Sequence, residues 1–468
     1  MDPVEGRERR VAAPLEGNMA EASNSGPVLT KQQRIAQLAE QTPRMSFTSL
    51  AYHMDLRWLY EAYLRTRPDG ATGVDGQTAT DYAADLRGNL QRLLDQAKSG
   101  TYRASPVRRV HIPKGTGRET RPLGIPTFED KVLQRAVVML LEPIYERDFL
   151  DCSYGFRPGR SAHQALAALW QQTMAMRGGW IVEVDIRKFF DTLDHTHLRE
   201  FLRQRIRDGV LLRLIGKWLK AGVLEDGVWT VGETGTPQGG VISPLLANVY
   251  LHYVLDEWFE REVKPRLKGR AFLVRYADDF VMGFACEEDA RRVLEVLPKR
   301  FGKYGLQLHP EKTRLVPFRR PDASPDRSGS GSESSWESFD FLGFRHIWSR
   351  SKKGYWVVKR QTAPSRFGRA LRGIAQWCRR HRHQSVSEQH RTLSQKVRGH
   401  FAYYGRLIGN YKSLQRFRHE VERVWRRWLS RRHRAGPMSW QRFSQLLKRY
   451  PLPVPTVWVS PLVVSSAT

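Results

Sequence analysis

The chain has 468 residues and a formal net charge of +29, because 77 lysines and arginines outnumber 48 aspartates and glutamates. This length allows about three domains and is ample to bury several hydrophobic cores. A charge of this size is typical of nucleic-acid-binding proteins, with proteins that bind anionic membrane surfaces as the second class. Hydrophobic residues make up only 40% of the chain, which excludes an all-membrane protein, and no apolar run approaches the roughly 18 residues of a membrane-spanning helix.

Cysteine usage and the N-terminus indicate the compartment. Cys152, Cys286 and Cys378 are far apart and odd in number, which argues against a disulfide framework or a cysteine zinc site. The first 30 residues carry both signs of charge and lack a continuous apolar core, so we expect no signal peptide. These features predict a cytoplasmic protein.

The N-terminal part is predicted to be helical after a flexible start. Residues 1–27 are rich in Gly, Pro, Glu, Asn and Ser and are predicted to form a mobile tail, within a partly disordered segment 1–40. Apolar residues at steps of three and four then predict an amphipathic helix at 56–63. A glycine-rich loop at 70–76 ends this helix, and a second one is predicted at about 79–98.

The middle of the chain alternates between predicted strands and helices. Residues 180–186 alternate strictly between two faces, and 272–284 contain two short β-rich runs around a polar centre, the pattern of a hairpin. Residues 319–338 are rich in Pro, Asp, Ser and Gly and are predicted to form a flexible loop. The other predicted elements are a strand at 107–112, a hairpin turn at 113–117, and helices at 129–147 and 161–176.

The section between Lys359 and Tyr450 is strongly basic, with 24 lysines and arginines against three acidic residues. Apolar residues spaced three or four apart around Trp425 predict a helix whose other face carries arginines. A single basic helix face is usually no more than a solvated surface. Here the bias extends over about 90 residues with aromatic side chains between the arginines, which favours binding of a phosphate backbone with stacked bases.

Carboxylates stand at the ends of predicted strands. Asp185 follows one strand, and Asp278 and Asp279 form the polar centre of the predicted hairpin. Adjacent buried carboxylates repel each other, and a divalent cation removes that cost. Two such ions about 3.5–4 Å apart can activate a 3′-hydroxyl and stabilise a leaving pyrophosphate. The alternative is a polar turn without chemistry, and spacing alone leaves both open.

At these residues the chain resembles a known family. Tyr276-Ala277-Asp278-Asp279 is similar to the Y-x-D-D box of reverse transcriptases. The ordered blocks around it, over roughly residues 55–345, resemble bacterial group II intron reverse transcriptases, also called maturases. The blocks are A-T-G-V-D-G at 71–76, I-P-K-G-T-G-R-E-T-R-P-L-G-I-P at 112–126, S-Y-G-F-R-P-G-R-S at 153–161, V-D-I-R-K-F-F-D-T-L-D-H at 184–195, G-T-P-Q-G-G-V-I-S-P-L-L-A-N at 235–248, G-L-Q-L-H-P-E-K-T at 305–313 and F-D-F-L-G-F at 339–344.

The resemblance implies a fold and its domains. The fold class would be α+β, a right-hand polymerase with fingers, an RNA-recognition-like palm and a helical thumb. Fingers and palm would span 41–350, and the thumb, which doubles as maturase domain X, would span 351–430. The basic segment 431–468 would bind DNA, and the sequence holds no paired Cys-x-x-Cys motif, so we expect no endonuclease domain.

The resemblance also implies the roles of single residues. Asp185, Asp278 and Asp279 would be the catalytic carboxylates that hold two Mg²⁺ ions, with the carbonyl of Ile186 as a further ligand and Mn²⁺ as a substitute. Phe190 would be a steric gate that excludes the ribose 2′-hydroxyl, and plain core packing is its alternative. Because the preceding residue is also a phenylalanine, only one of the two rings could face the core from a strand. The implied dNTP-binding residues are Lys114, Arg121, Phe190, Gln238 and Lys312. The nucleic-acid contacts, with weaker support, are Arg157, Arg160, Gly239, Arg398, Tyr403, Tyr404, Arg426 and Arg427.

The implied partners are the parent intron RNA as template and splicing partner, a DNA primer or target, and dNTPs. The implied location is the bacterial cytoplasm, at the nucleoid during mobility, and no membrane partner is expected. The sequence does not predict an oligomeric state. One alternative is an RNA-binding splicing cofactor only, which the intact carboxylates argue against. Another is a free-standing domesticated reverse transcriptase in DNA repair or phage defence, which the sequence barely separates from the maturase. An RNA-copying polymerase is disfavoured by Phe190.

Overall fold

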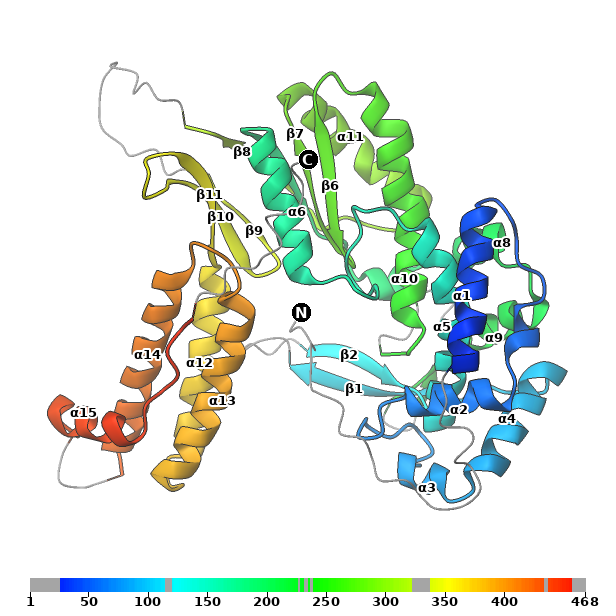
Figure 1. Cartoon of the computed structure of the whole chain (residues 1–468), viewed down its shortest axis with the longest axis horizontal. Coiled ribbons are helices and arrows are strands. Elements are labelled where there is room, and N and C mark those ends of the chain that lie inside the picture. Colours follow the sequence, from blue (N-terminus) through cyan, green and yellow to red (C-terminus); the bar gives the residue numbers. More distant parts are fainter. Residues whose placement is uncertain are drawn as a thin grey trace.

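The computed structural model describes residues 26–113, 120–225, 228–230, 235, 239–321, 337–432 and 437–456. Helices and strands are mixed over these ranges, in agreement with an α+β fold (Figure 1). The strands form sheets of order β2-β1-β4-β5, β6-β7-β3-β8 and β11-β10-β9. No helix in the described ranges is long and apolar enough to cross a membrane.

The N-terminal helices pack on α5 (Phe128–Asp148), which begins after the N-cap Thr127. Residues 26–40 of the expected tail are not disordered, because they form most of α1 (Gly26–Gln41). This helix buries Val28, Ile35 and Ala39 in the core, so the prediction of a tail through residue 40 was too long.

The predicted helix at 56–63 is confirmed as α2 (Leu56–Leu64). The second prediction, a single helix at 79–98, was wrong in one respect, because α3 (Ala79–Ala83) and α4 (Leu86–Ser99) are separate. Asp85 causes the break, since its side chain accepts a hydrogen bond from the Gly88 N–H and starts a new helix there.

The first sheet contains the predicted hairpin. Strands β1 (Val107–Pro113) and β2 (Thr120–Ile125) pair antiparallel, and the turn between them lies outside the described residues. Strands β4 (Val223–Glu225) and β5 (Val228–Thr230) extend this sheet.

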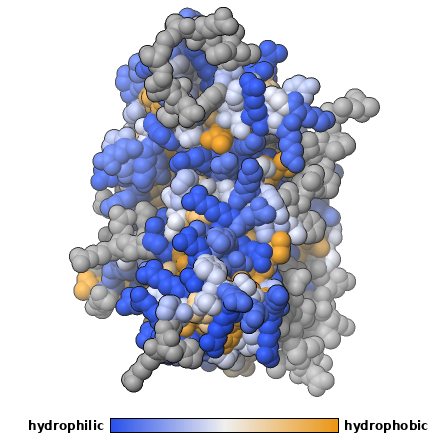
Figure 2. Space-filling model, turned by 90° about the vertical axis from the view of Figure 1, so that its left-hand side faces the viewer, coloured by the Kyte–Doolittle hydropathy of each residue, from blue (hydrophilic) through white to orange (hydrophobic). Residues whose placement is uncertain are grey.

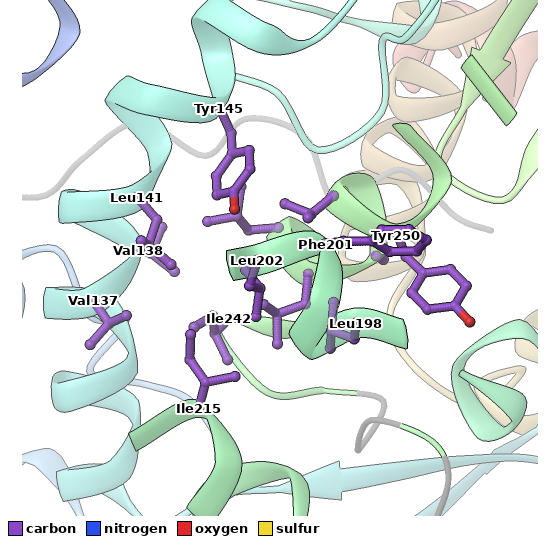
Figure 3. Packing of buried hydrophobic residues seen from close by; sticks show 14 of the residues in the cluster. Val137, Val138, Leu141, Tyr145, Leu198, Phe201, Leu202, Ile215, Ile242 and Tyr250 are labelled. Atoms are coloured by element: carbon purple, nitrogen blue, oxygen red, sulfur yellow. The ribbon is translucent and has the colours of Figure 1, made fainter. Parts of the chain in front are cut away.

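A helical core joins α5 to α8 (His195–Arg205), α9 (Gly209–Leu219) and α10 (Ser243–Leu251). Beyond α10 the chain continues in π-helical turns over His252–Asp256 and Trp258–Val263. Figure 3 shows apolar side chains from these elements facing one another between the helices. The labelled residues are Val137, Val138, Leu141, Tyr145, Leu198, Phe201, Leu202, Ile215, Ile242 and Tyr250.

The central sheet contains β3 (Gly178–Val184), β6 (Ala271–Tyr276), β7 (Asp279–Phe284) and β8 (Arg314–Arg319), all antiparallel to their neighbours. The predicted strand at 180–186 and hairpin at 272–284 are thereby confirmed. Apolar side chains cover both faces: α6 (Ala162–Ala175) shares one hydrophobic cluster with the sheet, and α11 (Glu287–Lys303) shares the other. Residues 322–336 of the expected loop at 319–338 lie outside the described residues.

The C-terminal part begins with β9 (Phe339–Phe341), β10 (Phe344–Arg350) and β11 (Trp356–Thr362). Four helices follow in Figure 1, on the side of the molecule away from α1: α12 (Pro364–Arg380), α13 (Val386–Tyr404), α14 (Tyr411–Ser430) and α15 (Trp440–Arg449). Helix α14 buries Leu414, Phe417, Val421, Trp425 and Leu429, which confirms the predicted apolar stripe.

Candidate active site

The central sheet brings the predicted carboxylates to one end. Strands β3 and β7 pair antiparallel with Val184 opposite Phe280, so Asp185 leaves β3 where β7 begins. Strands β6 and β7 pair up to Tyr276 opposite Asp279, which leaves Ala277 and Asp278 as the two turn residues. Three carboxylates from two separate parts of the sequence therefore meet at one sheet edge.

The electrostatics of this edge favour bound positive charge. Burial raises the pKa of Asp278, and the charge of Asp185 raises it further, while the Arg121 guanidinium lowers it. Burial together with the charges of Asp278 and Asp185 raises the pKa of Asp279 to about 6. The neighbouring carboxylates thus destabilise the ionised forms of Asp278 and Asp279, which is a cost that a cation removes.

The donor set fits a divalent metal ion. Among the described residues, the buried Oδ1 of Asp278 has no hydrogen-bond partner. Within the described residues, no group of three or more acidic, histidine or cysteine side chains is arranged to hold a metal ion by itself. Magnesium is usually held by one or two carboxylates with waters and substrate phosphates, so an open edge with Asp278 and Asp185 is compatible with it.

Lys312 lies at the carboxylates rather than apart from them. Its Nζ donates to Asp185 Oδ2 at 2.9 Å, and both side chains keep partial contact with solvent. The segment before it is fixed by His309, whose N–H donates to the Asp185 carbonyl at 2.8 Å, and by a bridge between Ile186 and Leu308. The ammonium therefore neutralises a predicted metal ligand, and its predicted contact with a dNTP stays a prediction.

The other predicted dNTP-binding residues differ in accessibility. Arg121 is half-buried on β2, close enough to Asp278 to shift its pKa. Phe190 is only 6% exposed and packs edge-to-face on Phe189 at 5.3 Å. Both rings are buried, because they lie in the short helix α7 (Phe189–Thr192) and not in the strand from which only one ring was expected to face the core. Lys114 and Gln238 lie outside the described residues.

Arg157 is not available for nucleic acid, contrary to the prediction. Its side chain is 4% exposed and pairs with Glu146, and it donates to the carbonyls of Leu150 and Ser153. A buried arginine with these partners holds the 150–157 loop together. Arg160 lies at the surface, paired with Asp151 at 2.6 Å, and stays a predicted contact.

Three residues of the C-terminal part also have structural partners. The Tyr403 hydroxyl donates to the Leu342 carbonyl at 2.8 Å, and Tyr404 packs on Phe344, so both rings join α13 to the β9–β10 turn. Arg426 donates to the Met438 carbonyl and covers the Trp440 ring, which ties α14 to α15. These contacts give the three side chains structural roles, and their contacts with nucleic acid stay predictions.

The nucleic-acid contacts of Arg398, Arg427 and Gly239 stay predictions. Arg398 and Arg427 are exposed on α13 and α14. Gly239 has φ +120°, and a Cβ there would lie 2.5 Å from the Gly124 carbonyl oxygen on β2. Packing against the protein therefore explains this glycine without a nucleic-acid strand.

Sequence reasoning missed a buried ion pair next to the turn between β6 and β7. Arg275 on β6 pairs with Asp256, and both side chains are 0% exposed. One signal was available, because an arginine inside the apolar run F-L-V-R-Y cannot face a hydrophobic core without a partner.

Comparison with known proteins assigns the chain to a protein family. A family model described as "Reverse transcriptase (RNA-dependent DNA polymerase)" matches residues 112–346, half of the chain and the part that holds all three carboxylates. The chain belongs to the reverse transcriptase family. Enzymes of this family generally use divalent metal ions, in agreement with the carboxylate edge.

Individual relatives narrow the relationship. The chain is 37% identical over 338 residues to Protein YkfC of Escherichia coli (strain K12), covering 64% of this chain and 82% of that protein. It is 37% identical over 289 residues to Group II intron-encoded protein LtrA of Lactococcus lactis subsp. cremoris, covering 58% of this chain and 47% of LtrA. The Putative COX1/OXI3 intron 1 protein of Saccharomyces cerevisiae is 26% identical over 326 residues, 59% of this chain and 38% of that protein. These similarities confirm the resemblance to group II intron reverse transcriptases, although the chain spans less than half of LtrA.

Proposed function

We propose that this reverse transcriptase copies RNA into DNA at the edge formed by Asp185, Asp278 and Asp279, and that it binds its parent group II intron RNA to assist splicing and mobility. The proposed polymerase activity rests on one observation: these carboxylates meet at one end of β3, β6 and β7. The intron-encoded relatives support the second activity and favour a maturase over a free-standing enzyme.

The chain's own residues have distinct tasks in this proposal. Asp185 and Asp278 would hold two divalent cations with help from Asp279 and the Ile186 carbonyl, Mg²⁺ in the cell and Mn²⁺ as a substitute. When bound, such ions activate a primer 3′-hydroxyl and stabilise the leaving pyrophosphate. Arg121 approaches Asp278 from β2 and would bind the triphosphate, since a guanidinium pairs well with phosphate oxygens. Lys312 would release Asp185 and turn to the incoming dNTP.

The C-terminal helices would form the thumb and RNA-binding surface. Helix α14 exposes Lys412, Arg416, Arg423 and Arg427 along the side opposite its buried stripe. The face of the molecule on this side is largely hydrophilic (Figure 2). Cationic side chains that recur at steps of four and seven along one side of a helix suit a phosphate backbone. Residues 1–25 and 457–468 lie outside the described ranges, so the DNA-binding role of 431–468 rests on its composition.

Two assays separate the parts of the proposal. Primer extension on an RNA template, with dNTPs and rNTPs supplied in parallel, tests the polymerase, and extension with dNTPs alone is expected. Splicing of RNA transcribed from the DNA that flanks the gene, with and without the protein, tests the maturase. Extension without any stimulation of splicing would leave a free-standing reverse transcriptase, and stimulation without extension would leave a splicing cofactor.

A further inference from the structure

A buried guanidinium lies directly beneath the turn that carries Asp278. Arg275 is the fifth residue of β6, and its side chain pairs with Asp256 in the π-helical turn after α10. Arg275 Nε donates to Asp256 Oδ1 at 2.8 Å and Nη2 donates to Oδ2 at 2.5 Å. Neither side chain has any exposed surface, so this bidentate pair is screened from water.

The third nitrogen of the guanidinium reaches the catalytic turn. Arg275 Nη1 donates to the Ala277 carbonyl at 3.0 Å and to Asn248 Oδ1 at 2.9 Å. The Ala277 carbonyl belongs to the peptide that joins Ala277 to Asp278, so its direction sets the backbone from which the Asp278 side chain leaves. Ala277 has φ +58°, a conformation that a non-glycine residue keeps only when its surroundings impose it.

A loop closes the turn from the other side. Asn248 Nδ2 donates to the Gly155 carbonyl at 2.8 Å, and a Cβ on Gly155 would lie 2.3 Å from the Ala277 nitrogen. The same loop pairs with β6, since the Arg275 N–H donates to the Cys152 carbonyl and the Tyr154 N–H to the Arg275 carbonyl. The turn therefore lies between the guanidinium and the glycine, with Asn248 joining the two.

Burying the Arg275–Asp256 ion pair costs desolvation free energy, so its presence indicates a role beyond stability. Buried ion pairs are often neutral or unfavourable relative to apolar residues of similar volume, while they can impose one geometry on their neighbours. Metal-binding carboxylates depend on such supporting hydrogen bonds for their direction. We propose that Arg275, held by Asp256 and Asn248, is a positioning residue that fixes the peptide between Ala277 and Asp278 and so aims the Asp278 carboxylate at divalent cations. This inference rests on the proposed polymerase function.

The double variant R275M/D256L tests the proposal, because it removes both buried charges together and leaves neither unpaired. A matched control is R205M/D148L, which removes a buried pair of α8 and α5 whose side chains are 4% and 14% exposed. Both are compared with the wild type by thermal unfolding, by Mn²⁺ titration followed by electron paramagnetic resonance, and by primer extension over a range of Mg²⁺ concentrations.

We expect R275M/D256L to remain folded, to bind Mn²⁺ about 10–100-fold more weakly and to lose kcat by a similar factor, the usual effect of removing support from a metal ligand. The control should lose thermal stability but keep Mn²⁺ affinity and the Mg²⁺ dependence. Wild-type Mn²⁺ affinity and kcat in R275M/D256L would overturn the proposal. A fall in melting temperature without either change would show a purely structural ion pair and would overturn it too.

A second variant decides the matter if the double variant does not fold. R275K keeps a charge opposite Asp256, but one ammonium cannot bond Asp256, Asn248 and the Ala277 carbonyl in the same planar geometry. We expect R275K to fold and still to show weakened Mn²⁺ binding, and wild-type binding in it would refute the inference. If the wild type binds Mn²⁺ but extends no primer, the polymerase proposal fails, while the Mn²⁺ comparison still tests Arg275.

Discussion

Each carboxylate at the sheet edge has its own protein environment. Asp185 is partly exposed and paired with Lys312, whereas Asp278 has a buried oxygen without a hydrogen-bond partner in the described part of the chain. Burial and the negative charges of Asp278 and Asp185 raise the pKa of Asp279 from 3.8 to about 6. Asp278 and Asp279 are therefore harder to ionise than free aspartates.

Asp279 makes a pH-dependent prediction about stability. Because its pKa is higher in the folded state than the ordinary value of 3.8, the folded chain binds the extra proton between about pH 4 and 6. Stability from this group is present at low pH and is lost as the pH rises through about 6. In metal-free buffer, Asp279→Asn should raise the melting temperature at pH 7, and this gain should shrink towards pH 4.5. Equal gains at both pH values would contradict the raised pKa.

Phe190 makes a second prediction at the residue scale. The ring is almost fully buried, and Phe190→Ala would cost about 3–5 kcal/mol as a core cavity, so Phe190→Val is the better probe. We expect this variant to melt at a lower temperature and also to incorporate more rNTP relative to dNTP in primer extension. Phe189→Val is the matched control, since that ring is buried beside it. Unchanged sugar selectivity in Phe190→Val would leave core packing as its only role.

At the scale of elements, local sequence patterns predicted the strands and helices well, but they did not predict which side chains contact each other in the folded chain. The alternation at 180–186 and the polar centre of 272–284 are local patterns, and the strands and turn they predict are present. The break between α3 and α4 depends on one capping side chain, Asp85, and the periodic spacing of apolar residues does not reveal it. Arg157 and Tyr403 could not be interpreted locally, because Glu146 and the Leu342 carbonyl meet them only in the folded chain.

Helix α14 carries a prediction about RNA binding. Lys412 and Arg427 are exposed on the side opposite the buried stripe, so K412Q/R427Q should fold normally. If each side chain neutralises one RNA phosphate, affinity should fall and the slope of log K against log salt should become shallower by about one for each phosphate that is no longer neutralised. The control R292Q/K299Q removes two exposed charges from α11. Identical slopes in the two variants would exclude α14 from the RNA-binding surface.

At the scale of the whole molecule, the carboxylate edge and the basic helices are physically connected. Tyr403 on α13 bonds the β9–β10 turn, and His163 on α6 bonds the Tyr403 carbonyl at 2.8 Å. Helix α6 in turn covers the sheet that carries the carboxylates. RNA held on the C-terminal helices would thus be placed on a body fixed to the sheet. The sequence could predict the carboxylate edge from a motif and the basic helices from their composition. The contacts that join them depend on the packing of residues far apart in the chain.

The most direct test of the central claim is primer extension on an RNA template by the wild type and Asp278→Ala, with RNA affinity measured in parallel. The account predicts extension with dNTPs by the wild type. It predicts a loss of several orders of magnitude in Asp278→Ala and nearly equal RNA binding by both, since Asp278 acts on the metal and not on the RNA surface. Extension by Asp278→Ala at the wild-type rate would contradict the assignment of the carboxylate edge as the catalytic site.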